Sequence, residues 1–228
     1  MKNKLLLLFF LLGVFFPLSA QESEVLISTS HTSLLLSTSQ GGELKFLYYG
    51  RKLTDADVHA IVSTESGSFS AYPVYGLNCP SESALSVQHE DGNMTLQMEV
   101  IGVETTHQEK ANLTVISLKD KVYPFYVKLC YKAYQDVDVI EAWTEISHKE
   151  KKNVKLNQFA SAYLPVRKGN VWLSSLYGAW ANEARLVQEP LEPGMKVIKN
   201  KDGVRNSHTA HAEVMFSLDG QPRENSGS

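Results

Sequence analysis

The sequence predicts an all-β protein, organised as a large antiparallel β-sandwich. Apolar and polar residues alternate with a period of two over many short stretches, which is typical of strands that bury one face. Turn-forming pairs such as Asp91-Gly92 and Pro193-Gly194 recur between these stretches. The period of amphipathic helices is almost absent. Many short strands joined by close turns favour a sandwich over a fold with covering helices.

The clearest strand pair is a hairpin formed by 124–134 and 137–147, with Gln135-Asp136 as its turn. Apolar and polar side chains alternate in the first segment, and the second is rich in β-branched and aromatic residues. The stretch 53–78 shows no clear period, so we expect a long loop there. Other strands are expected at 25–28, 33–38, 43–49, 94–103, 112–118, 159–166, 171–177, 184–189, 196–200 and 213–218.

Residues 1–20 have the layout of a secretory signal peptide. Two lysines precede the apolar run 5–16, and a small-residue exit ends at Ala20. We expect cleavage after Ala20, which leaves 21–228 as the mature chain. The apolar run is shorter than the roughly 20 residues of a transmembrane helix. The sequence therefore predicts a secreted or periplasmic protein that is not attached to a membrane after cleavage.

Length, charge and cysteine content narrow the remaining possibilities. The segment 21–228 is long enough for one sizeable domain. The formal net charge is −3 and the basic residues are scattered, so nucleic acid is not expected as a partner. For the two cysteines, Cys79 and Cys130, two alternatives stay open. They form a disulfide, which an oxidising compartment permits, or Cys130 is a buried free thiol.

A set of separated segments carries a family resemblance, in which the most distinctive stretch is Gly178-Ala-Trp180-Ala-Asn-Glu183-Ala-Arg185. In order along the chain, the segments are 42–44, 48–53, 123–126, 138–145, 159–162, 178–185 and 207–220. From about Ser23 onward the chain resembles the N-terminal domain of glycoside hydrolase family 36. The resemblance implies a β-supersandwich of the galactose mutarotase-like type. Members of this family are retaining α-galactosidases in which a (β/α)₈ barrel follows the sandwich.

The resemblance also implies a function for this chain. It is expected to be the N-terminal, non-catalytic part or fragment of an exported α-galactosidase, where it supports the barrel and a homo-oligomer. Retaining glycosidases use two carboxyl groups, and the family places both in the barrel. We therefore expect no catalytic residue and no cofactor in this chain, and we expect α-galactosides to bind through the catalytic domain.

Four residues are candidates for contact with substrate or with a neighbouring domain. Trp180, Glu183 and Arg185 combine an aromatic face with a carboxylate and a guanidinium, which suits a sugar but equally suits packing against a barrel or subunit. Asn78 stands where many members carry an Asp-Phe-Arg run, and it is the polar side chain left to replace that run. Trp143 and Trp172 lie in alternating strands and are expected to be core residues.

Other interpretations of the sequence remain open or are disfavoured. The pair His208 and His211 has a spacing compatible with metal binding, but no cysteine or carboxylate cluster accompanies it. We expect no metal site. A free-standing carbohydrate-binding or scaffold protein is the main alternative function. A mutarotase-like epimerase would need convergent histidines, whereas the remaining histidines are spread without a motif. They are His31, His59, His89, His107 and His148.

Overall fold

The computed structural model describes residues 23–38, 42–64, 69–76, 82–166, 169–200, 210–218 and 220–223. The chain divides into two compact units, Met1–Pro165 and Val166–Ser228. Every strand ladder between the named strands is antiparallel, which confirms the predicted all-β fold class. The predicted signal peptide, Asn78, Cys79 and His208 lie outside the described residues, and the expectation of a single domain over 21–228 stays a prediction.

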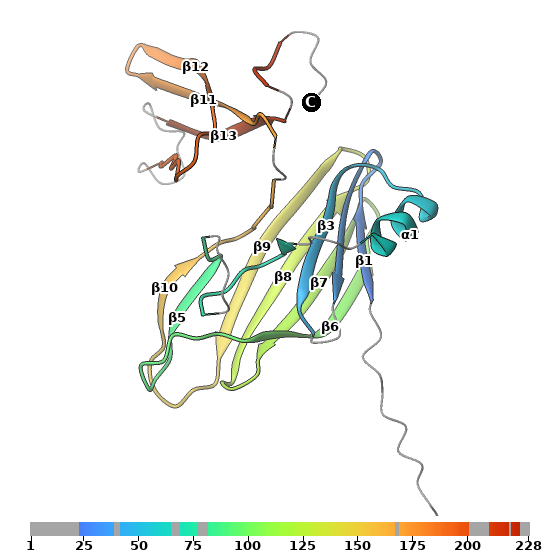
Figure 1. The fold of residues 1–228 in the computed structure, drawn as a ribbon, viewed down its shortest axis with the longest axis vertical. Helices are drawn as coiled ribbons and strands as arrows, with labels where there is room; N and C mark the ends of the chain where they lie inside the picture. The colour runs from blue at the N-terminus through green and yellow to red at the C-terminus, as the bar shows by residue number, and fades with distance from the viewer. Residues whose placement is uncertain are drawn as a thin grey trace, which may run out of the picture. The chain divides into compact units, whose positions relative to one another are not determined.

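The first unit contains two four-stranded sheets and one strand pair (Figure 1). The first sheet has the order β1-β2-β3-β4, formed by Glu24–Ser28, Thr32–Thr38, Leu44–Arg51 and Phe69–Ser70. The second has the order β6-β7-β8-β9, formed by Met98–His107, Ala111–Asp120, Phe125–Tyr134 and Val139–His148. The pair joins β5 (Leu85–Gln88) to β10 (Lys155–Phe159).

A single apolar core lies between the two larger sheets. Strand β8 contributes Phe125, Val127 and Leu129, which alternate with partly or fully exposed residues over the first half of the strand. The facing sheet contributes Ile27 and Phe46, among others. The predicted hairpin is therefore confirmed as β8 and β9, with the alternation placing one face in the core. Burial of apolar side chains at this interface is the main stabilising contribution.

Strand β2 departs from alternation because both of its faces are covered. Leu34 and Leu36 belong to the core between the sheets, whereas Leu35 lies in a second cluster with Leu47 and Val58. The second cluster packs helix α1 (Asp55–Ser63) on the outer side of the first sheet (Figure 1). A strand that is buried on both faces has a continuous run of apolar residues in its sequence, and the run Leu34–Leu36 is of this kind.

The helix corrects the expectation of a loop across 53–78. Thr54 caps its first turn, and the Thr54 and Asp57 side chains form a reciprocal capping box with the backbone. Val58 is buried, and Ile61 and Val62 pack against the same cluster, so the helix has an apolar stripe at positions i, i+3 and i+4 that spans little more than one turn. Within the described ranges no helix has the length and apolar character needed to cross a membrane.

The second unit is a three-stranded sheet with the order β12-β11-β13. Its strands are β11 (Trp172–Ala179), β12 (Asn182–Pro190) and β13 (Ala210–Ser217). The strand predicted at 196–200 is wrong, since that stretch has no strand pairing. The strand predicted at 159–166 is also wrong apart from its first residue, because its partner β5 has only four residues and the ladder ends at Phe159.

The two tryptophans expected in the core do not belong to it. Residues Ile140, Ala142 and Ile146 of β9 pack against the core, so Trp143 lies on the opposite, solvent-facing side of the sheet. Trp172 is half-buried, and its Nε1 donates to Asn170 Oδ1 at 3.3 Å. Two-residue periodicity indicates which residues share a face, but it does not indicate which face meets the opposing sheet.

Candidate functional site

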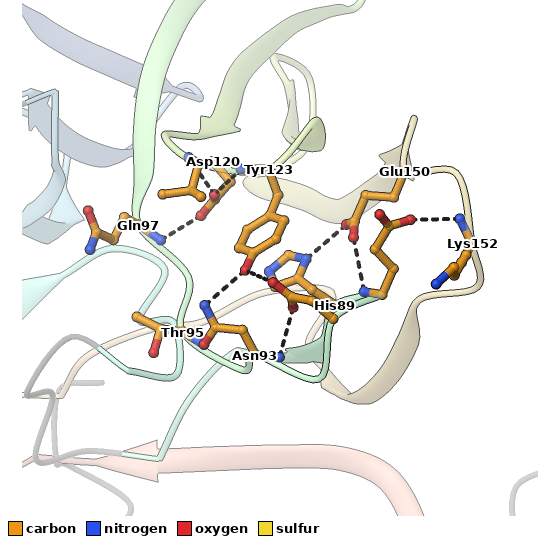
Figure 2. Close-up of polar contacts among 11 residues, drawn as sticks. His89, Asn93, Thr95, Gln97, Asp120, Tyr123, Glu150 and Lys152 are labelled. Atoms are coloured by element: carbon orange, nitrogen blue, oxygen red, sulfur yellow. Dashed lines mark hydrogen bonds and ion pairs between the residues drawn. The ribbon is translucent and has the colours of Figure 1, made fainter.

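Three loops of the first unit meet in a polar cluster (Figure 2). They are 89–97 after β5, 120–124 between β7 and β8, and 149–154 between β9 and β10. Each loop supplies at least one side chain that accepts hydrogen bonds from another segment of the cluster. The cluster therefore joins parts of the chain that are far apart in sequence.

His89 and Glu150 form the buried centre of this cluster. The Nδ1 of His89 lies 2.8 Å from Glu150 Oε1, and the two side chains are 0% and 2% exposed. The other oxygen, Glu150 Oε2, accepts the backbone N–H of Glu90 at 3.1 Å, and Glu90 Oε2 accepts the backbone N–H of Lys152 at 2.8 Å. The two glutamates thus fasten the 149–154 loop to the end of β5 by reciprocal side-chain-to-backbone bonds.

Tyr123 forms one wall of the cluster. Its ring is stacked on the His89 imidazole, and its hydroxyl donates to Asp91 Oδ2 at 2.7 Å while accepting from Asn93 Nδ2 at 3.0 Å. The bond to Asp91 raises the pKa of Tyr123. Bonds from the Asn93 backbone and from Tyr123 lower the pKa of Asp91. Each shift moves the pKa of the group further from 7, so neither side chain is suited to exchange a proton near pH 7.

Asp120 organises the turn that carries Tyr123. It is 1% exposed, and its carboxylate accepts three backbone N–H groups, from Gln97 at 2.6 Å, Val122 at 2.8 Å and Tyr123 at 2.7 Å. Three of the roughly four acceptor sites of this carboxylate thus hold backbone N–H groups. Asp120, Glu90 and Glu150 all accept backbone N–H groups, which assigns these three carboxylates a structural role in holding the loops together.

No sequence motif announced this cluster. The Asp91-Gly92 turn and the β7–β8 connection were recognisable as turns, yet His89 and Glu150 are separated by 61 positions. Only the packing of β5 beside β10 brings them together. In the sequence His89 is one of several histidines without a motif, and no local pattern marks Glu150 as its partner.

An apolar hollow of about 140 Å³ lies in the first unit, with lining side chains from both larger sheets. Tyr131 is among the lining residues, and burial raises its pKa to about 12. Binding sites for drug-sized molecules usually enclose about 300–1,000 Å³ and carry a few convergent polar groups. The hollow is smaller than that and is lined mainly by leucine, alanine and aromatic side chains, so it does not suit a sugar.

The predicted site residues Trp180, Glu183 and Arg185 lie together on the β11–β12 hairpin. Trp180 occupies the turn and is 84% exposed, and the other two side chains are also exposed. Ala181 and Ala184 have φ values of 60° and 57°. A left-handed backbone is unfavourable for alanine, and such strain is often concentrated at functional segments.

The sequence analysis expects no metal site at His208 and His211, and the structure describes His211 of this pair. His211 Nδ1 lies 3.5 Å from Glu213 Oε2. Among the residues that the structure describes, no group of three histidine, cysteine, aspartate or glutamate side chains is arranged to hold a metal ion.

Cys130 is a buried free thiol.

Comparison with known proteins identifies the family. The family model described as the glycosyl hydrolase family 36 N-terminal domain matches residues 42–228. The chain belongs to glycosyl hydrolase family 36. This confirms the resemblance carried by the ordered segments, which lie within the matched region.

Individual family 36 proteins are similar over different parts of the chain. The α-galactosidase Mel36A of Lactobacillus acidophilus is 29% identical over 104 residues, which are 46% of this chain and 14% of that protein. A crystal structure of the α-galactosidase AgaA of Geobacillus stearothermophilus with raffinose matches 84% of this chain at 20% identity, with a TM-score of 0.76. The α-galactosidase of Lactobacillus brevis matches 89% at 19% identity, with a TM-score of 0.73.

The chain spans about a third of the length of these solved family 36 enzymes, namely 31% and 32%. The likeness covers both units, and it assigns the described strands to the sandwich architecture of the N-terminal domain.

Proposed function

We propose that this chain is the N-terminal, non-catalytic domain of an exported α-galactosidase, in which it supports the catalytic domain and a homo-oligomer. The observation that carries the proposal is the family 36 match over residues 42–228. The similar proteins supply the substrate class, because they are α-galactosidases and one was crystallised with raffinose. The proposed substrate of the whole enzyme is accordingly an α-galactoside.

The surface of the second unit supports a role in domain or subunit contact. Trp180, Leu186 and Met215 are 84%, 60% and 59% exposed on a sheet of only three strands. Leu186 and Met215 lie opposite Leu176 and Ser174 of β11, so they share one face of the sheet, while Trp180 lies at the β11–β12 turn. Exposed apolar surface of this kind often marks a contact with another protein surface. Trp180, Glu183 and Arg185 are therefore proposed as contact residues toward the catalytic domain or a second subunit.

Chemical considerations support placing catalysis elsewhere in the enzyme. A retaining glycosidase needs one carboxylate as a nucleophile and a second carboxyl group as acid and base. The acidic side chains that converge in the first unit accept backbone N–H groups in a closed cluster. These contacts support the proposal that bond cleavage takes place in the catalytic domain.

Hydrolysis of an aryl α-galactoside tests the proposal. The natural gene product, purified from its source organism, is expected to release the aryl group, whereas protein limited to 21–228 is expected to release none above the buffer rate. Release by the 21–228 protein that is lost on changing one of its acidic residues would overturn the non-catalytic assignment. A natural product inactive on every α-galactoside tested would overturn the enzyme assignment.

Export is tested separately by mass spectrometry of the protein recovered outside the inner membrane. The mature N-terminus is expected at Gln21, because Ala20 ends the small-residue exit of the signal peptide. Recovery of the protein with Met1 retained would argue against secretion through this signal.

A further inference from the structure

The solvent-facing side of the β8–β9 hairpin carries an arrangement that neither the fold nor the proposed function explains. Cys130 is paired in register with Trp143, and this pair is flanked by Lys128 opposite Glu145 on one side and Lys132 opposite Glu141 on the other. Because the alternate residues of both strands enter the core, these six side chains share the outer face.

Trp143 is held against the sheet. Its Nε1 donates to Glu145 Oε1 at 3.4 Å, and the Cys130 thiol lies 4.0 Å from the same oxygen. Cys130 is only 2% exposed although it lies on the outer face. Burial, and secondly the charge of Glu145, raises the pKa of the Cys130 thiol. The thiol therefore stays protonated and can donate a hydrogen bond to Glu145 Oε1. One carboxylate oxygen thus anchors both side chains, and the tryptophan is half-buried.

Two more aromatic side chains continue the line along the hairpin. Tyr126 and Tyr134 lie four positions before and four positions after Cys130 on the same face of β8. At about 3.4 Å per residue, the line from Tyr126 to Tyr134 is about 27 Å long, with the Trp143 pair at its midpoint. Lys149 Nζ lies 5.8 Å from the Tyr126 ring centroid, and Lys132 Nζ lies 5.0 Å from that of Tyr134.

The charged groups beside Trp143 retain unused hydrogen-bonding capacity. Lys128 and Glu145 are direct cross-strand neighbours, as are Lys132 and Glu141, but neither pair forms an ion pair within 4.0 Å among the described residues. Glu141 accepts only the Tyr134 hydroxyl, at 3.0 Å. Ammonium donors and carboxylate acceptors therefore lie on both sides of the central aromatic ring.

We propose that this face of β8–β9 binds a linear oligosaccharide. The indole of Trp143 has an electron-rich face, which suits the C–H groups on the flat side of a pyranose. At the two ends of the row Lys149 and Lys132 lie over the tyrosine rings, where their ammonium groups, with the carboxylates beside Trp143, suit sugar hydroxyls. A row about 27 Å long exceeds a single sugar ring, so the ligand is an oligosaccharide and not galactose. The choice of α-galactosides as probes rests on the proposed function.

Calorimetric titration of the purified chain tests the proposal, with stachyose, maltotetraose and galactose as probes. Stachyose is expected to bind saturably and at least several-fold more tightly than galactose. Trp143→Ala is expected to weaken stachyose binding at least tenfold, and Glu145→Gln less, because an amide oxygen still accepts from the indole. The matched control is Trp172→Ala, which removes a half-buried tryptophan from the second unit and should leave binding unchanged. Circular dichroism and a thermal melt of each variant identify any loss of folding.

The outcomes separate this inference from the proposed function. Binding of maltotetraose without stachyose would support the carbohydrate surface and count against the galactoside assignment. Absence of saturable binding to either tetrasaccharide would overturn the inference, as would equal binding by folded Trp143→Ala and wild-type protein. Concentration-dependent dimerisation that is lost in Trp143→Ala, together with an absence of sugar binding, would overturn it in favour of an interface between two copies. None of these results depends on whether the natural enzyme hydrolyses an aryl α-galactoside.

Discussion

The imidazole of His89 lies parallel to the phenol ring of Tyr123, with ring centroids 3.6 Å apart and 8° between the ring planes. On its edge the same imidazole contacts the Glu150 carboxylate at 2.8 Å, and Phe125 packs against it in a T-shaped arrangement at 5.8 Å. One side chain therefore connects the 89–97 loop to the β7–β8 turn and to the β9–β10 loop.

His89→Ala is expected to destabilise the protein by about 3–5 kcal/mol, because it leaves the Glu150 carboxylate buried without its partner. Chemical denaturation measures the change. His107→Ala is the control, since His107 is exposed and makes one side-chain bond, to Asn112 at 2.9 Å. The control should change stability by no more than about 0.5 kcal/mol. Equal stability of the two variants would show that the buried cluster does not hold the loops.

Asp138→Asn is expected to reduce the acid sensitivity of the fold. The hydroxyls of Thr29 and Thr32 donate to the Asp138 carboxylate and lower its pKa below the ordinary 3.8. Because the folded pKa is the lower one, this stabilisation is present above 3.8 and is lost as the pH falls through the folded pKa.

Thermal melts of the wild type and Asp138→Asn, from neutral pH to below 3.8, measure this linkage. The difference between their midpoints should be largest near neutrality and should shrink at the acid end. Asp136→Asn removes an exposed carboxylate from the same turn and is the control. A difference that is constant with pH would contradict the assigned role of the two threonines.

Trp180→Ser is expected to leave the melting midpoint almost unchanged and to lower light scattering. At 84% exposure the indole contributes little to packing within the chain, and surface substitutions usually change stability by less than about 0.5 kcal/mol. Removal of an exposed apolar side chain should reduce self-association. Leu173→Ala, at a residue only 4% exposed in the same sheet, should cost about 2–5 kcal/mol. A comparable loss in Trp180→Ser would place the tryptophan in a core.

Thr54→Ala is expected to destabilise the protein by about 1 kcal/mol through loss of the helix cap. Faster amide hydrogen exchange along α1, with little change in β8, would localise the effect to the helix. Thr54→Ser retains a hydroxyl able to accept from the Asp57 N–H and should behave like the wild type. Equal exchange rates in both variants would indicate that packing against Leu35 and Leu47, and not the cap, determines where α1 begins.

Prediction from sequence succeeded where the signal is local. The β8–β9 hairpin follows from alternation on either side of a short turn, and the alternation also indicates which residues share a face. Prediction failed at α1, because the apolar stripe of Val58, Ile61 and Val62 covers little more than one turn of a nine-residue helix and is too short to stand out. The capping pair Thr54 and Asp57 is the clearer local signal of this helix.

The sequence by itself determined the all-β class and the family, because strand period and ordered segments are local properties of the chain. It did not determine, for any tryptophan, whether the side chain is exposed. The tertiary structure alone decided that Trp143 faces solvent and that His89 meets Glu150. Which face of a strand is buried depends on the sheet that packs against it. Likewise, a pair 61 positions apart forms only when the strands that carry it become neighbours, since nothing local to either residue specifies the other.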